Sequence, residues 1–131
     1  MARFQPADHS QGDPNTIGGY AAVHDRPAAF EGRDGFSYSV ELIVEQTERA
    51  GEWGGFLLFV RWARIGSQSP VGHLETDYIV REPIAERARG RLGALSLNDV
   101  RAILDDLIRA QDRAGASRSW LTVRPAEDDP E

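Results

Sequence analysis

The chain has 131 residues, of which 40% are hydrophobic and 27% charged, and its formal net charge is −6. This length fits one domain with a core of its own. The negative charge opposes nonspecific binding to nucleic acid, which needs basic patches. Cysteine is absent, so disulfides, thiolate metal sites and thiol catalysis are excluded.

Both ends of the chain are polar. Residues 1–16 predict a flexible tail and residues 125–131 an acidic disordered tail, because neither segment can bury enough apolar surface to offset ordering entropy. Residues 17–124 then form a single α+β domain. The N-terminal residues lack the apolar stretch of a signal peptide, and the longest apolar run, Phe56–Val60, is too short to span a bilayer. We therefore expect a cytoplasmic protein that binds neither membranes nor nucleic acid.

The N-terminal half of the domain predicts short elements and one clear strand. The first ordered element is expected over residues 17–24, although Gly18 and Gly19 weaken it. A short extended piece over 28–31 and a tight turn over 32–35 follow, since Asp and Gly suit positive φ. Apolar side chains then alternate with polar ones in a period of two, which predicts a half-buried strand. They are Phe36, Tyr38, Val40, Leu42 and Val44.

Two further strands are predicted. Residues 56–65 are apolar on both faces, which is typical of a central strand covered on more than one side. Residues 66–70 read as a turn and residues 71–80 as the next strand. Because short loops join the three strands, an antiparallel meander is the default topology.

The C-terminal part changes to helical spacing. Pro83 precedes a short helix predicted over residues 84–92, and Ser96 with Asp99 is a helix-start signal. One apolar stripe follows, with Gly115 as the expected stop. Residues 119–123 are expected to pack back as a last strand or as an extended segment. The stripe consists of Val100, Ile103, Leu104, Leu107 and Ile108. The predicted fold is therefore α+β: an antiparallel meander of three to five strands, packed on one face by a C-terminal amphipathic helix, plus one short helix.

Pairing strands 56–65 and 71–80 through their five-residue turn predicts a register. Trp62 would lie opposite Leu74, Arg61 beside Glu75 and Phe59 beside Asp77. In this register one face of the sheet is apolar and receives the helix. The second face combines ionisable with apolar side chains. The ionisable ones are Glu41, Arg61, His73, Glu75 and Asp77, and the apolar ones include Ile43, Leu57, Phe59, Ile65 and Ile79.

Three hypotheses account for this mixed face. The first is an interface with a second copy or another protein, with Phe59, Arg61, Glu41 and Glu75 on the face and Trp53 in a neighbouring loop. The second is a small-molecule or catalytic site built from His73, Glu75, Asp77 and Arg61. The third is a set of cross-strand ion pairs in water, which need no function. We favour a small accessory or binding protein that acts through protein–protein contact, as a homodimer through this second face.

The spacing His73-x-Glu75-x-Asp77 does not favour a metal site. Side chains on one strand face lie about 7 Å apart, and metal ligands must converge to about 2 Å from one ion. The sequence also has no glycine-rich phosphate loop and no nucleophile elbow. We therefore expect no metal and no cofactor, and enzymatic activity is the less favoured interpretation.

Overall fold

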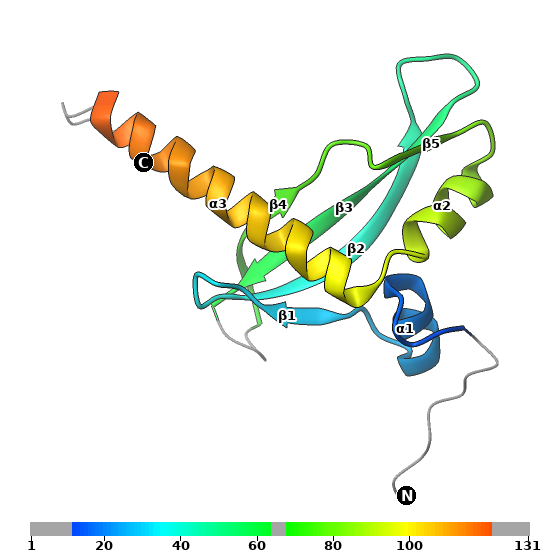
Figure 1. Cartoon of the computed structure of the whole chain (residues 1–131), viewed down its shortest axis with the longest axis horizontal. Coiled ribbons are helices and arrows are strands. Elements are labelled where there is room, and N and C mark those ends of the chain that lie inside the picture. The colour runs from blue at the N-terminus through cyan, green and yellow to red at the C-terminus, as the bar shows by residue number, and fades with distance from the viewer. Residues whose placement is uncertain (1–11, 64–67, 122–131) are drawn as a thin grey trace, which may run out of the picture.

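The computed structural model describes residues 12–63 and 68–121, with side chains in the last helix as far as Ala114. It has an antiparallel sheet and three helices, as the α+β prediction expects (Figure 1). The elements in chain order are α1 (Ile17–His24), β1 (Ala29–Glu31), β2 (Ser37–Gln46), β3 (Trp53–Trp62), β4 (Pro70–Glu75), β5 (Val80–Glu82), α2 (Ala85–Gly93) and α3 (Leu97–Leu121).

The sheet is a meander in the order β1-β2-β3-β4, and β5 pairs with the first residues of β3. The single strand predicted over 71–80 is thus wrong, because it splits into β4 and β5, which share one edge of β3. Thr76 makes the break: its amide donates to Leu57 O at 3.1 Å, and its hydroxyl accepts from the Leu57 amide at 3.1 Å. The Thr76 hydroxyl thereby replaces a backbone carbonyl as the acceptor. The chain then leaves β3 before it pairs with β3 again as β5.

The first ordered element of the described chain is helical. Thr16 caps α1 by accepting a hydrogen bond from the Gly19 amide at 3.0 Å. Gly18 faces α2, where a Cβ would lie 2.9 Å from the Cα of Gly93. The two glycines therefore let the helices approach more closely than larger residues allow. Residues 12–16, within the predicted tail, form the turn before α1, whereas residues 1–11 and 122–131 lie outside the described parts.

Helix α3 begins as predicted, because the Ser96 hydroxyl accepts a hydrogen bond from the Asp99 amide at 3.0 Å. The predicted stripe faces the sheet, with Val100, Leu104 and Ile108 buried and its other two members half-buried. The predicted end at Gly115 is wrong, since α3 runs to Leu121. A glycine costs a helix only about 1 kcal/mol, and the predicted extended segment is helical over 119–121.

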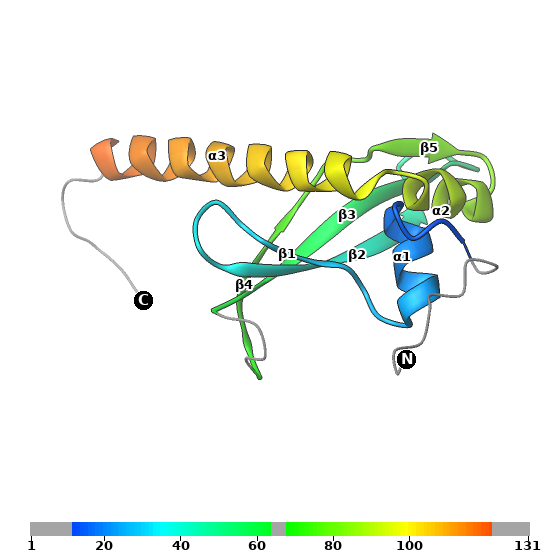
Figure 2. The same ribbon diagram turned by 60° about the horizontal axis from the view of Figure 1, so that its bottom comes forward.

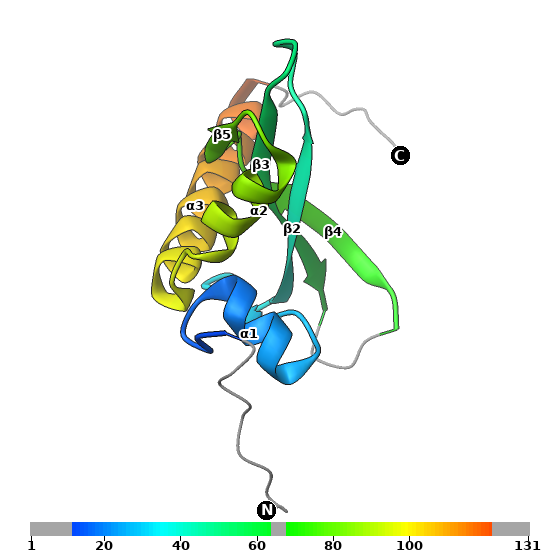
Figure 3. The same ribbon diagram turned by 90° about the vertical axis from the view of Figure 1, so that its right-hand side faces the viewer.

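Helices α2 and α3 lie on one side of the sheet. In Figure 3, α2 and α3 cover one face, and no helix or strand of the described chain covers the other. Figure 2 shows that α3 also extends beyond the sheet toward its C-terminal end. The core fills the space between these layers. Its largest fully buried side chains are Tyr38, Phe59, Ile17, Leu57, Leu92, Leu104, Ile108, Val40 and Val100.

The predicted pairing of β3 with β4 is wrong. In the structure Phe59 lies opposite Leu74, and Leu58 lies opposite Glu75. The observed pairing of β3 with β4 is therefore displaced from the predicted register by an odd number of residues. Such a shift exchanges the two faces of a strand, so Leu57, Phe59 and Arg61 point to the helices. The apolar side predicted for β2 is confirmed, because Tyr38 and Val40 are buried on the side of the sheet that faces the helices.

Candidate functional site

The uncovered side of the sheet carries a continuous apolar stripe along β3. We call this surface the open face. Strand β2 places Ile43 beside the stripe, and all these apolar side chains are half-buried against one another. The stripe in β3 consists of Phe56, Leu58, Val60 and Trp62. Large apolar side chains gathered on an uncovered sheet are typical of a contact surface.

Carboxylates border this stripe on both sides. Glu41 of β2 and Glu75 of β4 lie on either side of Leu58, and both are exposed. Further along, Ser39 and His73 flank Val60 in the same way. The open face is therefore apolar along its centre and negative along part of its border.

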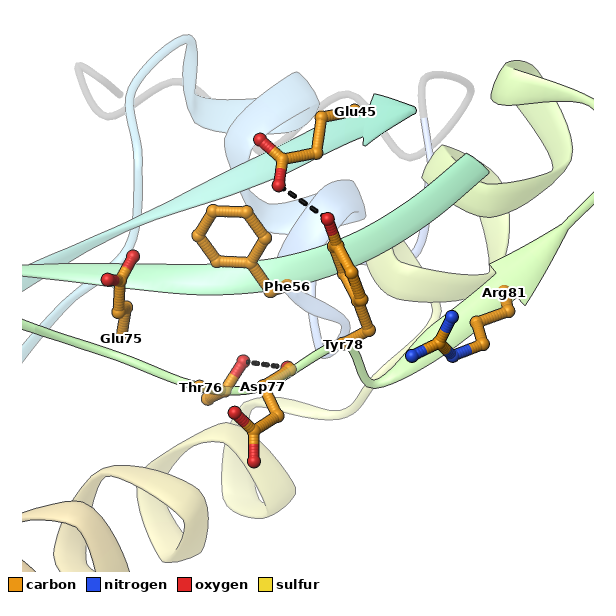
Figure 4. A pocket seen from close by; sticks show the side chains of 7 residues that line it. All are labelled: Glu45, Phe56, Glu75, Thr76, Asp77, Tyr78 and Arg81. Atoms are coloured by element: carbon orange, nitrogen blue, oxygen red, sulfur yellow. Dashed lines mark hydrogen bonds between the residues drawn. The ribbon is translucent and has the colours of Figure 1, made fainter. Parts of the chain in front are cut away.

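One end of the open face is hollowed (Figure 4). The hollow has a volume of about 450 Å³ and is lined by Glu45, Phe56, Glu75, Thr76, Asp77, Tyr78 and Arg81. The Tyr78 hydroxyl donates a hydrogen bond of 2.6 Å to Glu45, and its ring meets that of Phe56 edge-on at 6.1 Å. The Arg81 guanidinium lies 5.0 Å from the centre of the Tyr78 ring. Tyr78 thus bridges the end of β2 and the segment between β4 and β5.

Gly54 makes room for this arrangement. A Cβ at Gly54 would lie 2.5 Å from Cδ1 of Tyr78, so the ring rests directly on the β3 backbone. The hydrogen bond to Glu45 raises the pKa of Tyr78, since it stabilises the protonated phenol beside a carboxylate. Tyr78 thus holds one wall of the hollow between Glu45 and the β3 backbone.

A second polar cluster supports Arg81. Glu52, in the β2–β3 hairpin, accepts hydrogen bonds from the Thr47 hydroxyl at 2.6 Å and from Arg81 at 2.8 Å. The hydrogen bond from Thr47 is the largest of the effects that lower the pKa of Glu52. The hairpin, β5 and one wall of the hollow are thus tied together.

Arg61 does not belong to the open face. On the helix side, its Nε donates to the Tyr38 hydroxyl at 2.8 Å and a terminal nitrogen donates to Gln111 of α3 at 2.6 Å. The Tyr38 hydroxyl donates in turn to Asp34 at 2.6 Å. Burial, more than these contacts, raises the pKa of Tyr38 to about 12. This network joins α3 to the sheet, so the predicted place of Arg61 beside Glu75 is wrong.

The residues predicted for the interface are divided by the fold. Glu41 and Glu75 lie on the open face, whereas Phe59 is fully buried under the helices. Trp53 is the first residue of β3, not a loop tip, and it packs against the core while half-buried. The apolar stripe of the open face is formed by the even-numbered side chains of β3, which the predicted register places on the core side.

The structure brings together only some of the residues predicted for a small-molecule site. His73 and Glu75 share the open face, and both are exposed. Asp77 follows β4 and lines the hollow with Glu75, whereas His73 is not among its lining residues. Within 12–63 and 68–121, no group of three His, Cys, Asp or Glu side chains could hold a metal ion.

Comparisons with other proteins add no assignment: no family model, no curated protein and no solved structure matches the chain. No helix in the part of the chain that the structure describes is long and apolar enough to cross a membrane.

Proposed function

We propose that the protein acts by protein–protein contact and that the open face is its contact surface. The observation that carries this proposal is the apolar stripe of β3 on the uncovered side of the sheet. Removing such side chains from water is the main favourable contribution to most protein–protein association. Aromatic residues such as Phe56 and Trp62 contribute strongly to interfaces of this kind.

The charges on the border favour one class of partner. Three carboxylates are exposed beside the stripe, those of Glu41, Glu45 and Glu75. The imidazole of His73 lies on the same face of the sheet. A partner that presents apolar side chains between arginines or lysines would complement both features. Electrostatic complementarity of this kind guides association and excludes competing partners.

The test compares binding by the wild-type protein with binding by face variants. Proteins recovered on the immobilised wild type, but lost with Leu58→Asp, would be purified and titrated against both by calorimetry. We expect the affinity for such a partner to fall at least roughly tenfold, or about 1.4 kcal/mol. The affinity should also weaken between about 50 mM and about 500 mM salt, since salt screens exposed charges.

Two further variants separate binding from folding. Glu41→Arg changes an exposed charge without touching the core, and it should weaken the same partner. Asn98→Asp adds a negative charge at an exposed position of α3 and should leave binding unchanged. The proposal fails if folded Leu58→Asp and Glu41→Arg bind every recovered protein as tightly as the wild type does.

A further inference from the structure

Strand β4 is the end strand of the sheet, and its outer edge meets no other strand of the described chain (Figure 3). The amide of Thr76 donates to Leu57 O, which makes Leu57 and Thr76 a hydrogen-bonded pair. Hydrogen-bonded pairs alternate along an antiparallel ladder, so Leu74 also turns its backbone groups toward β3. The backbone groups of His73 and Glu75 therefore point out of the sheet.

The opposite edge of the sheet differs. Strand β1 has three residues, and the carbonyl of Glu31 accepts a hydrogen bond from Arg101 of α3 at 3.4 Å. This carbonyl points outward, because the Val40 amide donates to Ala28 O and the Gly32 amide donates to Phe36 O. The residues between these hydrogen-bonded pairs alternate, so Phe30 faces β2 and Glu31 faces away from it. One edge is thus short and covered in part by a helix side chain, whereas β4 has six residues, five of them exposed.

The exposed side chains of β4 complement themselves. His73 and Glu75 lie two residues apart on the open face, on either side of Leu74. If two β4 strands pair antiparallel about a two-fold axis at Leu74, each His73 stands opposite Glu75 of the second copy. Both residues then use their outward backbone groups as a hydrogen-bonded pair. An imidazole N–H can donate a hydrogen bond to a carboxylate directly opposite it, whereas two carboxylates directly opposite each other are unfavourable.

We propose that β4 pairs with β4 of a second copy of the chain in this register over residues 73–75, forming a homodimer with one continuous sheet. The neighbouring registers are disfavoured, because an axis at His73 or at Glu75 sets that residue opposite its own copy. The pairing joins the two open faces side by side and leaves their apolar stripes uncovered. The homodimer therefore does not rest on the function proposed for the open face.

The first test is the mass of the full chain in solution, measured by sedimentation equilibrium at about 100 µM, where a micromolar dimer is almost fully formed. The expected mass is twice 14.5 kDa. His73→Pro removes an outward amide without removing a ladder hydrogen bond to β3, so it should give a folded monomer. A monomeric wild type at this concentration would overturn the proposal.

A charge exchange tests the register. Glu75→Arg removes the carboxylate opposite His73 and should weaken the dimer at least roughly tenfold. The double variant His73→Glu with Glu75→Arg sets a carboxylate opposite an arginine and should restore the dimer. Pairing through β4 would be overturned if the dimer persists in both His73→Pro and Glu75→Arg. It would also be overturned if Leu58→Asp is the only one of these variants that dissociates the dimer. A dimer weakened by Glu75→Arg but not restored by the double variant would overturn the register.

Discussion

Arg61 and Tyr38 are joined across strands β2 and β3 by a hydrogen bond of 2.8 Å from Nε to the phenolic oxygen. Through this bond the sheet is connected to Asp34 before β2 and to Gln111 on α3. The Arg61 side chain is only 17% exposed, so these partners replace much of the water around its guanidinium. The pair lies on the side of β3 that meets the helices, opposite the open face.

Replacing Tyr38 with phenylalanine should lower the free energy of unfolding by about 1–3 kcal/mol, because Arg61 and Asp34 lose a partly buried partner. Urea titration followed by circular dichroism measures the change. Tyr78→Phe removes an exposed hydrogen bond to Glu45 and should cost less than about 1 kcal/mol. Equal losses in the two variants would contradict a special role for the Tyr38 network.

The stability should also depend on Tyr38 at high pH. Its pKa is raised from 10.0 to about 12, so the folded protein keeps a phenolic proton that the unfolded chain releases. The stabilisation is present below pH 10 and is lost as the pH rises toward 12. Its full size is roughly 2–3 kcal/mol for a shift of two units. The free energy of unfolding of the wild type and of Tyr38→Phe, measured between these two pH values, gives the size of this stabilisation. The same change of that free energy with pH in both proteins would contradict it.

Leu104 of α3 is fully buried, so Leu104→Ala should cost about 2–5 kcal/mol of stability. Asp106→Ala, on the exposed side of the same helix, should stay within about 0.5 kcal/mol of the wild type. Thermal and urea unfolding measure both. A loss below about 0.5 kcal/mol for Leu104→Ala would show that α3 packs with another side toward the sheet.

Gly54→Ala should destabilise the protein by about 1–3 kcal/mol, because its Cβ would meet the Tyr78 ring at 2.5 Å. Gly90→Ala is the matched control, since nothing lies within 4 Å of a Cβ there, and alanine should stabilise α2 by about 0.5–1 kcal/mol. Adding Tyr78→Ala to Gly54→Ala should recover part of the loss. Additive losses in the double variant would contradict direct contact.

Several features follow from the sequence by itself. The alternation of Tyr38, Val40 and Leu42 predicts β2 and its helix-facing side. Alternate side chains of a strand share one face, and only one face of a half-buried strand is apolar. Ser96 defines the start of α3, and the apolar stripe defines the side that it buries. These signals are local, since each depends on side chains a few residues apart.

The tertiary structure alone decided the candidate surface. Strand β3 is apolar on both faces, so its pattern fits either orientation, and the pairing with Leu74 together with the Arg61 network selects one. The Thr76 hydroxyl ends β4, because it replaces a backbone carbonyl as the acceptor for the Leu57 amide. The alternation of side chains in the sequence does not indicate this break. The sequence therefore determined the elements, whereas contacts between distant residues decided which apolar side chains form the core and which form the open face.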